Sequence, residues 1–500
     1  METLRIEGFR SIRDSGEINL KPLTVVIGKN SCGKSSFIRF FPLLKQSIEK
    51  EISETLLWYG DYVDFGDYES IKPKFSNEIP TSFEMKLKLS EAALPYFYLT
   101  SIFAEDFEMD VIIKIYVSEK HINKLIILFF DQTIEILMNE NETVDMIMVN
   151  NICKEDFNYF WSRESRAVLP IIGRKVENNS YYFLRDDETI KNLIANTIRE
   201  IVHKNTKEQK IRDLVEKIAV IQPKAKLRSF LCNYDNLSSV SNFFMSDPRN
   251  EDFLDKINAY AILCRFPAFI FLINRLLVNE IDNIHYLKPI RANVNRYYRI
   301  QGLNIEHVDA DGSNLAMVLY NLTDDERKTF EGWCENNFGI KFSVSKKSGH
   351  ASLIVYDSQE NEINLADTGY GYSQILPIIV ELWLLINKNK DVDEKRITIV
   401  IEQPELHLHP AFQSKVIDLF ANIISQAHEH NVNIKIIFET HSETMINRLG
   451  YLVSKGSLDK RNVNILAFAK KDAETIISPM EFNEMGRIRN WPIGFFSMED

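Results

Sequence analysis

The feature that most constrains this chain is a nine-residue loop near its N-terminus, Gly28–Ser36, with the sequence GKNSCGKSS. It fits the pattern G-x-x-x-x-G-K-[ST] of a phosphate-binding loop. The apolar, β-branched run Leu23–Ile27 before it predicts a buried strand, and Ser36–Phe41 after it predicts the start of a helix. Strand, loop and helix in this order are the context that the pattern requires, which disfavours the alternative of a chance glycine-lysine turn.

The residue types of this loop suit a nucleotide phosphate. Glycines at positions 28 and 33 allow a tight turn whose N–H groups face one oxyanion, and the following helix adds its positive end. Lys34 is expected to reach the β- and γ-phosphates, and the Ser35 hydroxyl to bind Mg²⁺. The loop residues predicted to bind nucleotide are Asn30, Ser31, Cys32, Gly33, Lys34, Ser35 and Ser36.

A second apolar run, Ile397–Ile401, predicts a buried strand that ends in Glu402-Gln403-Pro404-Glu405. Because ligands gather at the carboxyl ends of parallel strands, we expect Glu402 to hold Mg²⁺ together with Ser35. Gln403 stands where a carboxylate usually polarises the attacking water. An amide can orient water but cannot take its proton, and Glu405 is the nearest alternative carboxylate.

A third apolar run, Ile434–Phe438, predicts another strand, which is followed by Glu439-Thr440-His441-Ser442. His441 at this strand end is a candidate hydrogen-bond donor to a γ-phosphate, while Thr or Ser as a simple helix cap is the alternative. The pair His407 and His409 could suggest a transition-metal site with Glu402 and Glu405, but the order of the surrounding motifs already explains that segment.

Residues 367–374 precede an apolar run, Ile375–Ile386, that predicts a helix. Two glycines and a serine before a helix form an anion-binding N-terminus, so Gly371, Ser373 and Gln374 are predicted to contact nucleotide. An ordinary capped helix start stays open as the alternative. Farther upstream, Arg291, Arg296 and Arg299 form a small basic cluster, which fits either a phosphate contact or a solvated loop.

The middle of the chain predicts two kinds of structure. Short runs of partial alternation from Thr81 to about Val149 predict an antiparallel sheet, and helical spacing of apolar residues from about Asp186 to Asn279 predicts a helical insertion. The net charge of −12 argues against strong bulk attraction to nucleic acid, although a local basic groove stays open. With no signal peptide, no apolar stretch long enough to span a bilayer and no paired cysteine spacing, we expect a cytoplasmic protein.

Taken together, these motifs resemble those of ABC-type ATPases of the SMC, RecF and OLD kind, over about residues 1–70 and 280–500. Gly28–Ser36 matches the Walker A loop, Asp367–Gln374 resembles a divergent signature motif, and Glu402 matches the Walker B acid. Gln403 takes the place of the catalytic Glu, and Leu406–Pro410 resembles the D-loop. His441 matches the switch histidine.

The resemblance implies an α/β fold, an ABC-type ATPase head. Such a head has a P-loop mixed sheet with flanking helices and an antiparallel β portion, here with a helical insertion. We expect residues 1–185 to form the N-terminal half of the head, 186–280 the insertion and 281–500 the C-terminal half. The family's cofactors are ATP and Mg²⁺. Gln403 departs from the family pattern, so the resemblance implies a slow ATPase.

The stretch EQPELHLHP at Glu402–Pro410 and the tail Trp491–Phe496 are similar to stand-alone bacterial ATPases. These include ATPase subunits of anti-phage systems, such as PtuA of Septu and AriA of PARIS. The resemblance implies a homodimer or higher homo-oligomer around ATP, a separate nuclease effector subunit of HNH or Toprim type, possible DNA contact and no membrane. Nuclease activity is not expected in this chain, since only about sixty residues follow His441, fewer than a typical domain.

Two other functions remain to be weighed. A DNA-clamping repair or chromosome-associated ATPase predicts long heptad coiled-coil arms and a basic groove, but the insertion is short and irregular and the chain is acidic. A transporter ATPase subunit is disfavoured by the remote signature motif and the large insertion. An ATPase that regulates a nuclease is therefore the favoured hypothesis.

Overall fold

The computed structural model describes residues 1–488 apart from 76–78, 91–101, 104–107, 155–158, 164–165, 177–179, 183–187, 304, 358, 389–394 and 430–431. The tail Trp491–Phe496 lies outside the described residues. Two compact units are present. Unit 1 contains Met1–Gly8, Ser47–Leu57 and Asn77–Ile281, and unit 2 contains Phe9–Gln46, Trp58–Ser76 and Asp282–Asp500.

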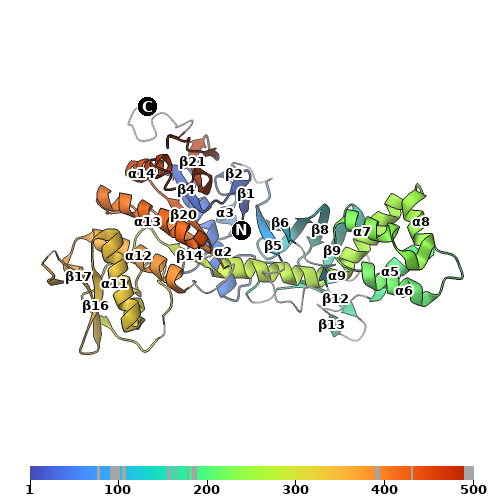
Figure 1. Cartoon of the computed structure of the whole chain (residues 1–500), viewed down its shortest axis with the longest axis horizontal. Helices are drawn as coiled ribbons and strands as arrows, with labels where there is room; N and C mark the ends of the chain where they lie inside the picture. The colour runs from blue at the N-terminus through green and yellow to red at the C-terminus, as the bar shows by residue number, and fades with distance from the viewer. Residues whose placement is uncertain are drawn as a thin grey trace. The chain divides into compact units, whose positions relative to one another are not determined.

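A six-stranded mixed sheet forms the centre of unit 2 (Figure 1). Its strands lie in the order β14 (Ile284–Leu287), β19 (Arg396–Glu402), β20 (Asn433–Glu439), β4 (Leu23–Gly28), β21 (Val463–Lys471) and β22 (Glu474–Met480). The first five are parallel, and β22 returns antiparallel to β21. Every residue of β4 is buried, as expected for an apolar strand in the interior of a parallel sheet.

Helices α12 (Tyr370–Lys388), α13 (Pro410–Glu429) and α14 (Glu443–Ser454) lie beside this sheet and share its hydrophobic core (Figure 1). Three helices follow the phosphate loop along the chain. They are α1 (Lys34–Ile38), α2 (Phe40–Glu49) and the short α3 (Tyr68–Ile71). Strands β2 (Ile12–Asp14) and β3 (Ile18–Asn19) lead into β4.

The same unit carries a smaller antiparallel sheet of β15 (Tyr298–Arg299), β16 (Phe342–Lys347), β17 (His350–Tyr356) and β18 (Glu362–Asn364). Helices α10 (Leu315–Asn321) and α11 (Asp324–Phe338) pack on it. Helix α11 begins with a capping box between Thr323 and Glu326 and ends at Gly339, whose φ of 67° suits glycine.

Unit 1 contains an antiparallel meander in the order β10-β9-β8-β7-β6-β5-β1. Its strands are β1 (Thr3–Phe9), β5 (Ser82–Ser90), β6 (Glu108–Val117), β7 (Ile122–Phe129), β8 (Gln132–Met138), β9 (Val144–Val149) and β10 (Ile152–Lys154). Burial alternates strictly along β8, as the alternating sequence predicts for one packed face. A second sheet consists of β11 (Tyr159–Ser162), β12 (Ile171–Val176) and β13 (Ser180–Tyr182).

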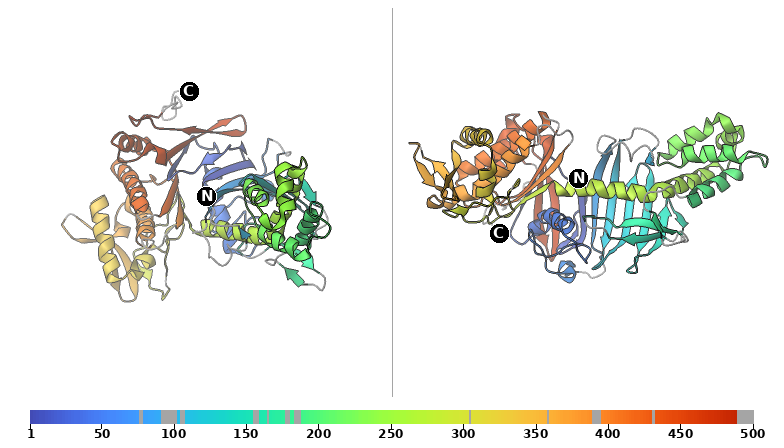
Figure 2. Two further views of the ribbon diagram at one scale, coloured as in Figure 1. Left: turned by 45° about the vertical axis from the view of Figure 1, so that its right-hand side comes forward. Right: turned by 90° about the horizontal axis from the view of Figure 1, so that it is seen from below.

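The helices of unit 1 are α5 (Glu188–Arg199), α6 (Glu208–Ile218), α7 (Lys224–Cys232), α8 (Ser238–Ser246) and α9 (Asn250–Asp282). Figure 2 shows α9 running along the meander. Contacts that hold it there include the Phe129–Phe269 ring pair at 4.8 Å and the hydrogen bond from Asn258 Nδ2 to Gln132 Oε1 at 2.7 Å.

Helix α9 meets the length and composition expected of a membrane-spanning helix, with a mean hydropathy of 1.8 over its best window. Its apolar run is interrupted by Arg265 and Arg275, so it is not the unbroken apolar stretch that the sequence analysis considered. However, 67% of that window is buried inside the structure. This burial is the behaviour of a core helix, and among the described residues α9 is the one helix that meets these criteria.

The predicted α/β class is confirmed: a P-loop mixed sheet with flanking helices, an antiparallel β portion and a helical segment are all present. The division at 185 and 280 stays a prediction. In the division into compact units, the meander and the helices up to Ile281 belong to unit 1. The phosphate loop belongs to unit 2, together with the C-terminal residues. The phosphate loop and the distant strand ends at Glu402 and Glu439 therefore belong to one compact unit.

Candidate nucleotide-binding site

The phosphate loop lies between β4 and α1, as predicted. Gly33 is the N-cap of α1 with φ 99°, a conformation that other residues rarely adopt. A Cβ at Gly28 would lie 2.5 Å from the carbonyl oxygen of Phe468, and one at Gly33 would overlap the Thr475 hydroxyl. Both glycines are therefore required because strands β21 and β22 approach the loop closely.

Lys34 is buried at the base of this loop. Its Nζ donates to the carbonyl oxygens of Gly28 at 3.0 Å and Lys29 at 2.8 Å, and lies 3.5 Å from Glu439 Oε1. The loop therefore wraps around its own lysine, and the ammonium lies within reach of a carboxylate.

Glu439, at the end of β20, is a carboxylate in contact with the loop. Ser35 Oγ donates to Glu439 Oε2 at 3.4 Å. The Glu439 side chain is 3% exposed, and burial, with Glu402 nearby, raises the pKa of its carboxyl. Glu439 was not among the predicted site residues, although it stands at a strand end beside His441.

Glu402, the predicted Mg²⁺ ligand, lies at the end of β19 and is held by other side chains. Arg39 binds it in a bidentate pair, Nε to Oε1 at 2.7 Å and Nη2 to Oε2 at 2.9 Å, and the Tyr286 hydroxyl donates to Oε1 at 2.6 Å. The Arg39 pKa is raised by this pair, and the Tyr286 pKa is raised by burial. Both carboxylate oxygens of Glu402 therefore already accept hydrogen bonds.

The remaining predicted catalytic residues surround this pair of strand ends. Gln403 adopts φ 44° at the turn after β19. Glu405 Oε1 accepts from the backbone N–H of His441 at 2.7 Å, and its buried Oε2 has no hydrogen-bond partner among the described residues. His441 Nε2 lies 3.8 Å from Glu439 Oε1, and burial followed by the Lys34 charge lowers the His441 pKa. Both effects favour the neutral form of the imidazole.

The signature-like residues differ from the prediction in their local structure. Helix α12 begins at Tyr370 rather than near residue 375, so Gly371, Ser373 and Gln374 lie in its first turns and not in a loop before it. Ser373 Oγ donates to the Tyr370 carbonyl at 2.7 Å, because a serine near a helix start satisfies a nearby backbone group.

Gln374 links α12 to the strand ends through Arg291. Its Oε1 accepts from the Arg291 N–H at 3.2 Å, its Nε2 donates to the Arg291 carbonyl at 3.3 Å, and Arg291 Nη2 donates to the Glu402 carbonyl at 3.3 Å. Arg291 is 1% exposed, whereas Arg296 is half exposed and paired with Asp367. Two residues of the predicted basic cluster therefore have different surroundings: Arg291 is buried, and Arg296 pairs with Asp367 at the surface.

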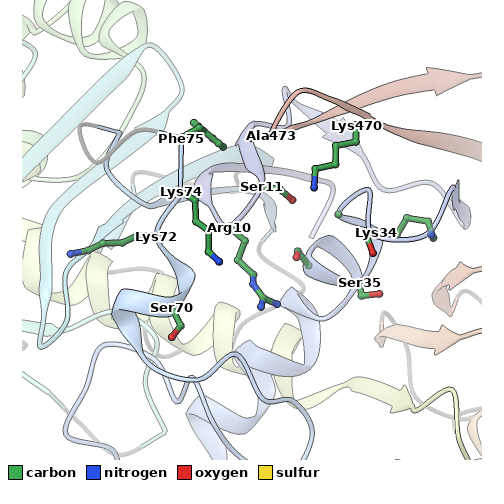
Figure 3. Close-up of a pocket in the computed structure, with 13 residues that line it drawn as sticks. Arg10, Ser11, Lys34, Ser35, Ser70, Lys72, Lys74, Phe75, Lys470 and Ala473 are labelled. Atoms are coloured by element: carbon green, nitrogen blue, oxygen red, sulfur yellow. The ribbon is translucent and has the colours of Figure 1, made fainter.

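A pocket of about 680 Å³ opens beside the loop (Figure 3). Of the loop residues predicted to bind nucleotide, Ser31, Gly33, Lys34, Ser35 and Ser36 line this pocket, while Asn30 and the buried Cys32 do not. Its other lining residues are Arg10, Ser11, Ser70, Lys72, Lys74, Phe75, Lys470 and Ala473. In Figure 3, Arg10, Lys74 and Lys470 extend around the space, and Lys72 points away from it.

These basic side chains were missed by the sequence analysis. Arg10 is held by a hydrogen bond from its N–H to the Ile71 carbonyl, and its guanidinium lies 5.4 Å from the centre of the Phe65 ring. No sequence pattern joins positions 10, 74 and 470, since they come together only when the chain folds. Together with Lys34 they make a pocket suited to several negative charges.

The histidines considered as metal ligands, His407 and His409, are both exposed. Among the described residues, the group of three potential ligands that converge is His285, His307 and Glu381. Here His285 Nδ1 lies 2.6 Å from Glu381 Oε1, so these two groups contact each other directly. A transition-metal site at residues 402–409 is not supported.

A phosphate loop at the carboxyl end of a buried parallel strand, with acidic residues at the ends of neighbouring strands, defines a P-loop ATPase. Comparison with known families agrees, because the model of the AAA ATPase domain family matches residues 1–446. The chain belongs to this AAA ATPase domain family.

Among curated proteins, the chain is similar to Endonuclease GajA of Bacillus cereus (strain HuB5-5), with 22% identity over 460 residues. The match covers 89% of this chain and 56% of GajA, so the chain spans about half of that relative's length.

SMC head domains align weakly with this chain. The head from Thermotoga maritima is 10% identical, covering 96% of this chain and 98% of its own, with a TM-score of 0.32. The head with a coiled coil and joint from Pyrococcus yayanosii is 11% identical, covering 97% of each, with a TM-score of 0.36. Scores of this size support no inference.

Proposed function

We propose that this chain is the ATP-binding subunit of an anti-phage complex, in which it hydrolyses ATP slowly and regulates a separate nuclease effector. The observation that carries the ATPase part is the basic pocket beside the phosphate loop, with Lys34 and Ser35 facing the buried carboxylate of Glu439 at the end of β20. This arrangement provides positive charge for phosphates on one side and oxygen ligands for Mg²⁺ on the other.

Slow hydrolysis is proposed from the residue at position 403. An amide side chain at this place cannot accept the proton of the attacking water, and the nearest carboxylate, Glu405, hydrogen-bonds the His441 backbone. With slow hydrolysis, ATP stays bound for longer. If it binds the closed state more tightly than the open state, it stabilises the closed state. We therefore propose a homodimer or higher homo-oligomer that closes on ATP, with residues 371–374 facing the partner's nucleotide.

The nuclease partner is proposed from the similarity to Endonuclease GajA. The matched region corresponds to 56% of that protein, which leaves a large part of it without a counterpart in this chain. An effector supplied by a second subunit, of HNH or Toprim type, would fill this role. A cytoplasmic location is proposed as well; the described cysteines Cys32, Cys232, Cys264 and Cys334 are free thiols, as in a reducing compartment.

The test compares the wild-type chain with Lys34→Ala, and with Lys455→Ala as a matched exposed control. Mg²⁺-dependent phosphate release and mass by light scattering are measured with and without ATP. We expect the control to behave as wild type, and Lys34→Ala to lose both turnover and ATP-dependent assembly.

If ATP drives assembly of Lys34→Ala to the same extent as assembly of the wild type, the clamp is contradicted. Co-purification with a neighbouring nuclease subunit tests the defence role. A salt-dependent DNA titration tests the alternative of direct DNA clamping, which predicts tight binding that weakens steeply with salt.

A further inference from the structure

We propose that Glu439, and not Glu402, is the carboxylate that joins Ser35 in binding the divalent cation that accompanies the nucleotide. In this assignment Glu402 binds Arg39 instead and stays in that pair. The inference rests on the proposed nucleotide-binding function and names a ligand within it.

The first argument is the position of the Glu439 carboxylate. Its Oε2 lies 3.4 Å from Ser35 Oγ, and its Oε1 faces Lys34 Nζ at 3.5 Å and His441 Nε2 at 3.8 Å. One oxygen therefore faces the hydroxyl predicted to bind the metal, while the other faces the groups predicted to contact phosphate.

The second argument is that the two oxygens are spaced for a shared cation. Adjacent ligands of an octahedral Mg²⁺ with bonds of 2.0–2.1 Å are about 3 Å apart. Ser35 Oγ and Glu439 Oε2, at 3.4 Å, are close to this separation and make only a long hydrogen bond. A small adjustment would allow both to bind one ion.

The third argument is that Glu402 is already occupied. Its two oxygens accept three hydrogen bonds, at 2.6, 2.7 and 2.9 Å, from Tyr286 and Arg39. Its side chain is 3% exposed, and removing one member of a buried, hydrogen-bonded ion pair is costly. The Arg39 guanidinium also places positive charge where a dication would have to approach.

The fourth argument is topological. Strands β19 and β20 are parallel neighbours, and Glu402 and Glu439 are paired in their register. Both carboxylates therefore lie at the carboxyl ends of their strands, on the same side of the sheet as the phosphate loop. A cation at Glu439 would also neutralise a buried carboxylate that faces a second one.

The alternative is that Glu439 serves only as a counter-ion for Lys34. The two readings differ in their dependence on metal. A counter-ion changes nucleotide affinity whether or not a cation is present, whereas a metal ligand matters only when the cation is bound.

The experiment measures Mn²⁺ binding by EPR to the full chain saturated with the non-hydrolysable analogue AMPPNP, and AMPPNP binding in EDTA by calorimetry. Variants are Glu439→Gln, Glu439→Asp and Glu402→Gln, with the exposed Glu481→Gln as the matched control. Circular dichroism checks that each variant is folded.

We expect Glu439→Gln to weaken Mn²⁺ binding by about 10- to 100-fold, a range typical of losing a group that supports a metal site. Glu439→Asp, which keeps the charge but is one methylene shorter, should lie between it and wild type. Glu402→Gln and Glu481→Gln should stay within about threefold of wild type, less than 1 kcal/mol. In EDTA, Glu439→Gln should bind AMPPNP as wild type does.

Three results would overturn the assignment. If Glu402→Gln loses Mn²⁺ as much as Glu439→Gln or more, then Glu402 is the cation ligand. If Glu439→Gln loses AMPPNP affinity equally with and without metal, Glu439 is a counter-ion of Lys34. If wild type binds no AMPPNP, the proposed function fails, and the assignment falls with it.

Discussion

Arg291 offers a prediction with a sign that can be worked out from the structure. Its guanidinium is almost completely inaccessible, and Nε and Nη1 have no hydrogen-bond partner among the described residues. Burial lowers the pKa of the guanidinium from 12.5 to about 10, against the opposing charges of Glu405 and Glu402. Arg291 is therefore still charged at pH 7, and its charged form is less favourable in the fold than in water.

The size of this cost follows from the pKa. A change from 12.5 to about 10 corresponds to roughly 3 kcal/mol, since each pKa unit is about 1.4 kcal/mol. An apolar side chain of similar length at this position would remove the cost of burying the charge. Because Arg291→Met also loses the hydrogen bond to the Glu402 carbonyl, we expect a net gain of about 1–2 kcal/mol in the free energy of unfolding.

Thermal unfolding followed by circular dichroism measures this gain. For a unit of this size, 1 kcal/mol shifts the midpoint by about 2–4 °C, so Arg291→Met should unfold at least about 2 °C higher than wild type. The matched control is Arg296→Met, whose exposed pair with Asp367 is expected to be worth less than about 1 kcal/mol. A midpoint for Arg291→Met that falls below wild type by more than the control would refute the reasoning, because it would show that Glu405 and Glu402 overcompensate the buried charge.

Three further changes test other parts of unit 2. Gly450→Ala should destabilise by about 1–3 kcal/mol despite its better helix propensity, because the new Cβ would overlap the Gly486 carbonyl oxygen; an unchanged thermal midpoint would contradict this close contact. Thr323→Ala removes the N-cap and the reciprocal bond with Glu326, so it should cost about 1 kcal/mol in urea unfolding, and no loss would show that the capping box is not formed. Burial raises the pKa of the Glu405 carboxyl above 4.5, so its stabilising contribution is present below pH 4.5 and is lost as pH rises through the folded-state pKa. Glu405→Gln should accordingly gain stability relative to wild type as pH rises from 4.5 to 8, and a difference that does not grow over this range would show the opposite sign.

The strands of unit 2 show which elements can be predicted from the pattern of neighbouring residues. The runs at 397–401 and 434–438 are confirmed as β19 and β20, because continuous β-branched stretches are characteristic of strands buried on both faces. The start of α12 was placed too late, since two glycines and a serine are poor helix formers in isolation. In the folded chain, Gln374 in the first turns of α12 makes two hydrogen bonds with the backbone of Arg291.

Charge pairing, in contrast, could not be read from the chain. Glu402 was expected to face Ser35, but Arg39 binds it, and the carboxylate beside Ser35 belongs to Glu439. Both acids end neighbouring strands, so sequence alone could not decide between them.

What the sequence determined by itself is the phosphate loop and the kinds of residue at the strand ends, because a loop motif and strand hydrophobicity are properties of consecutive residues. The tertiary structure alone decided which acid faces the loop and which basic side chains, from positions 10, 74 and 470, surround its pocket. The physical reason is that these are contacts between residues far apart in the chain, selected by sheet register and by competition among buried charges for partners.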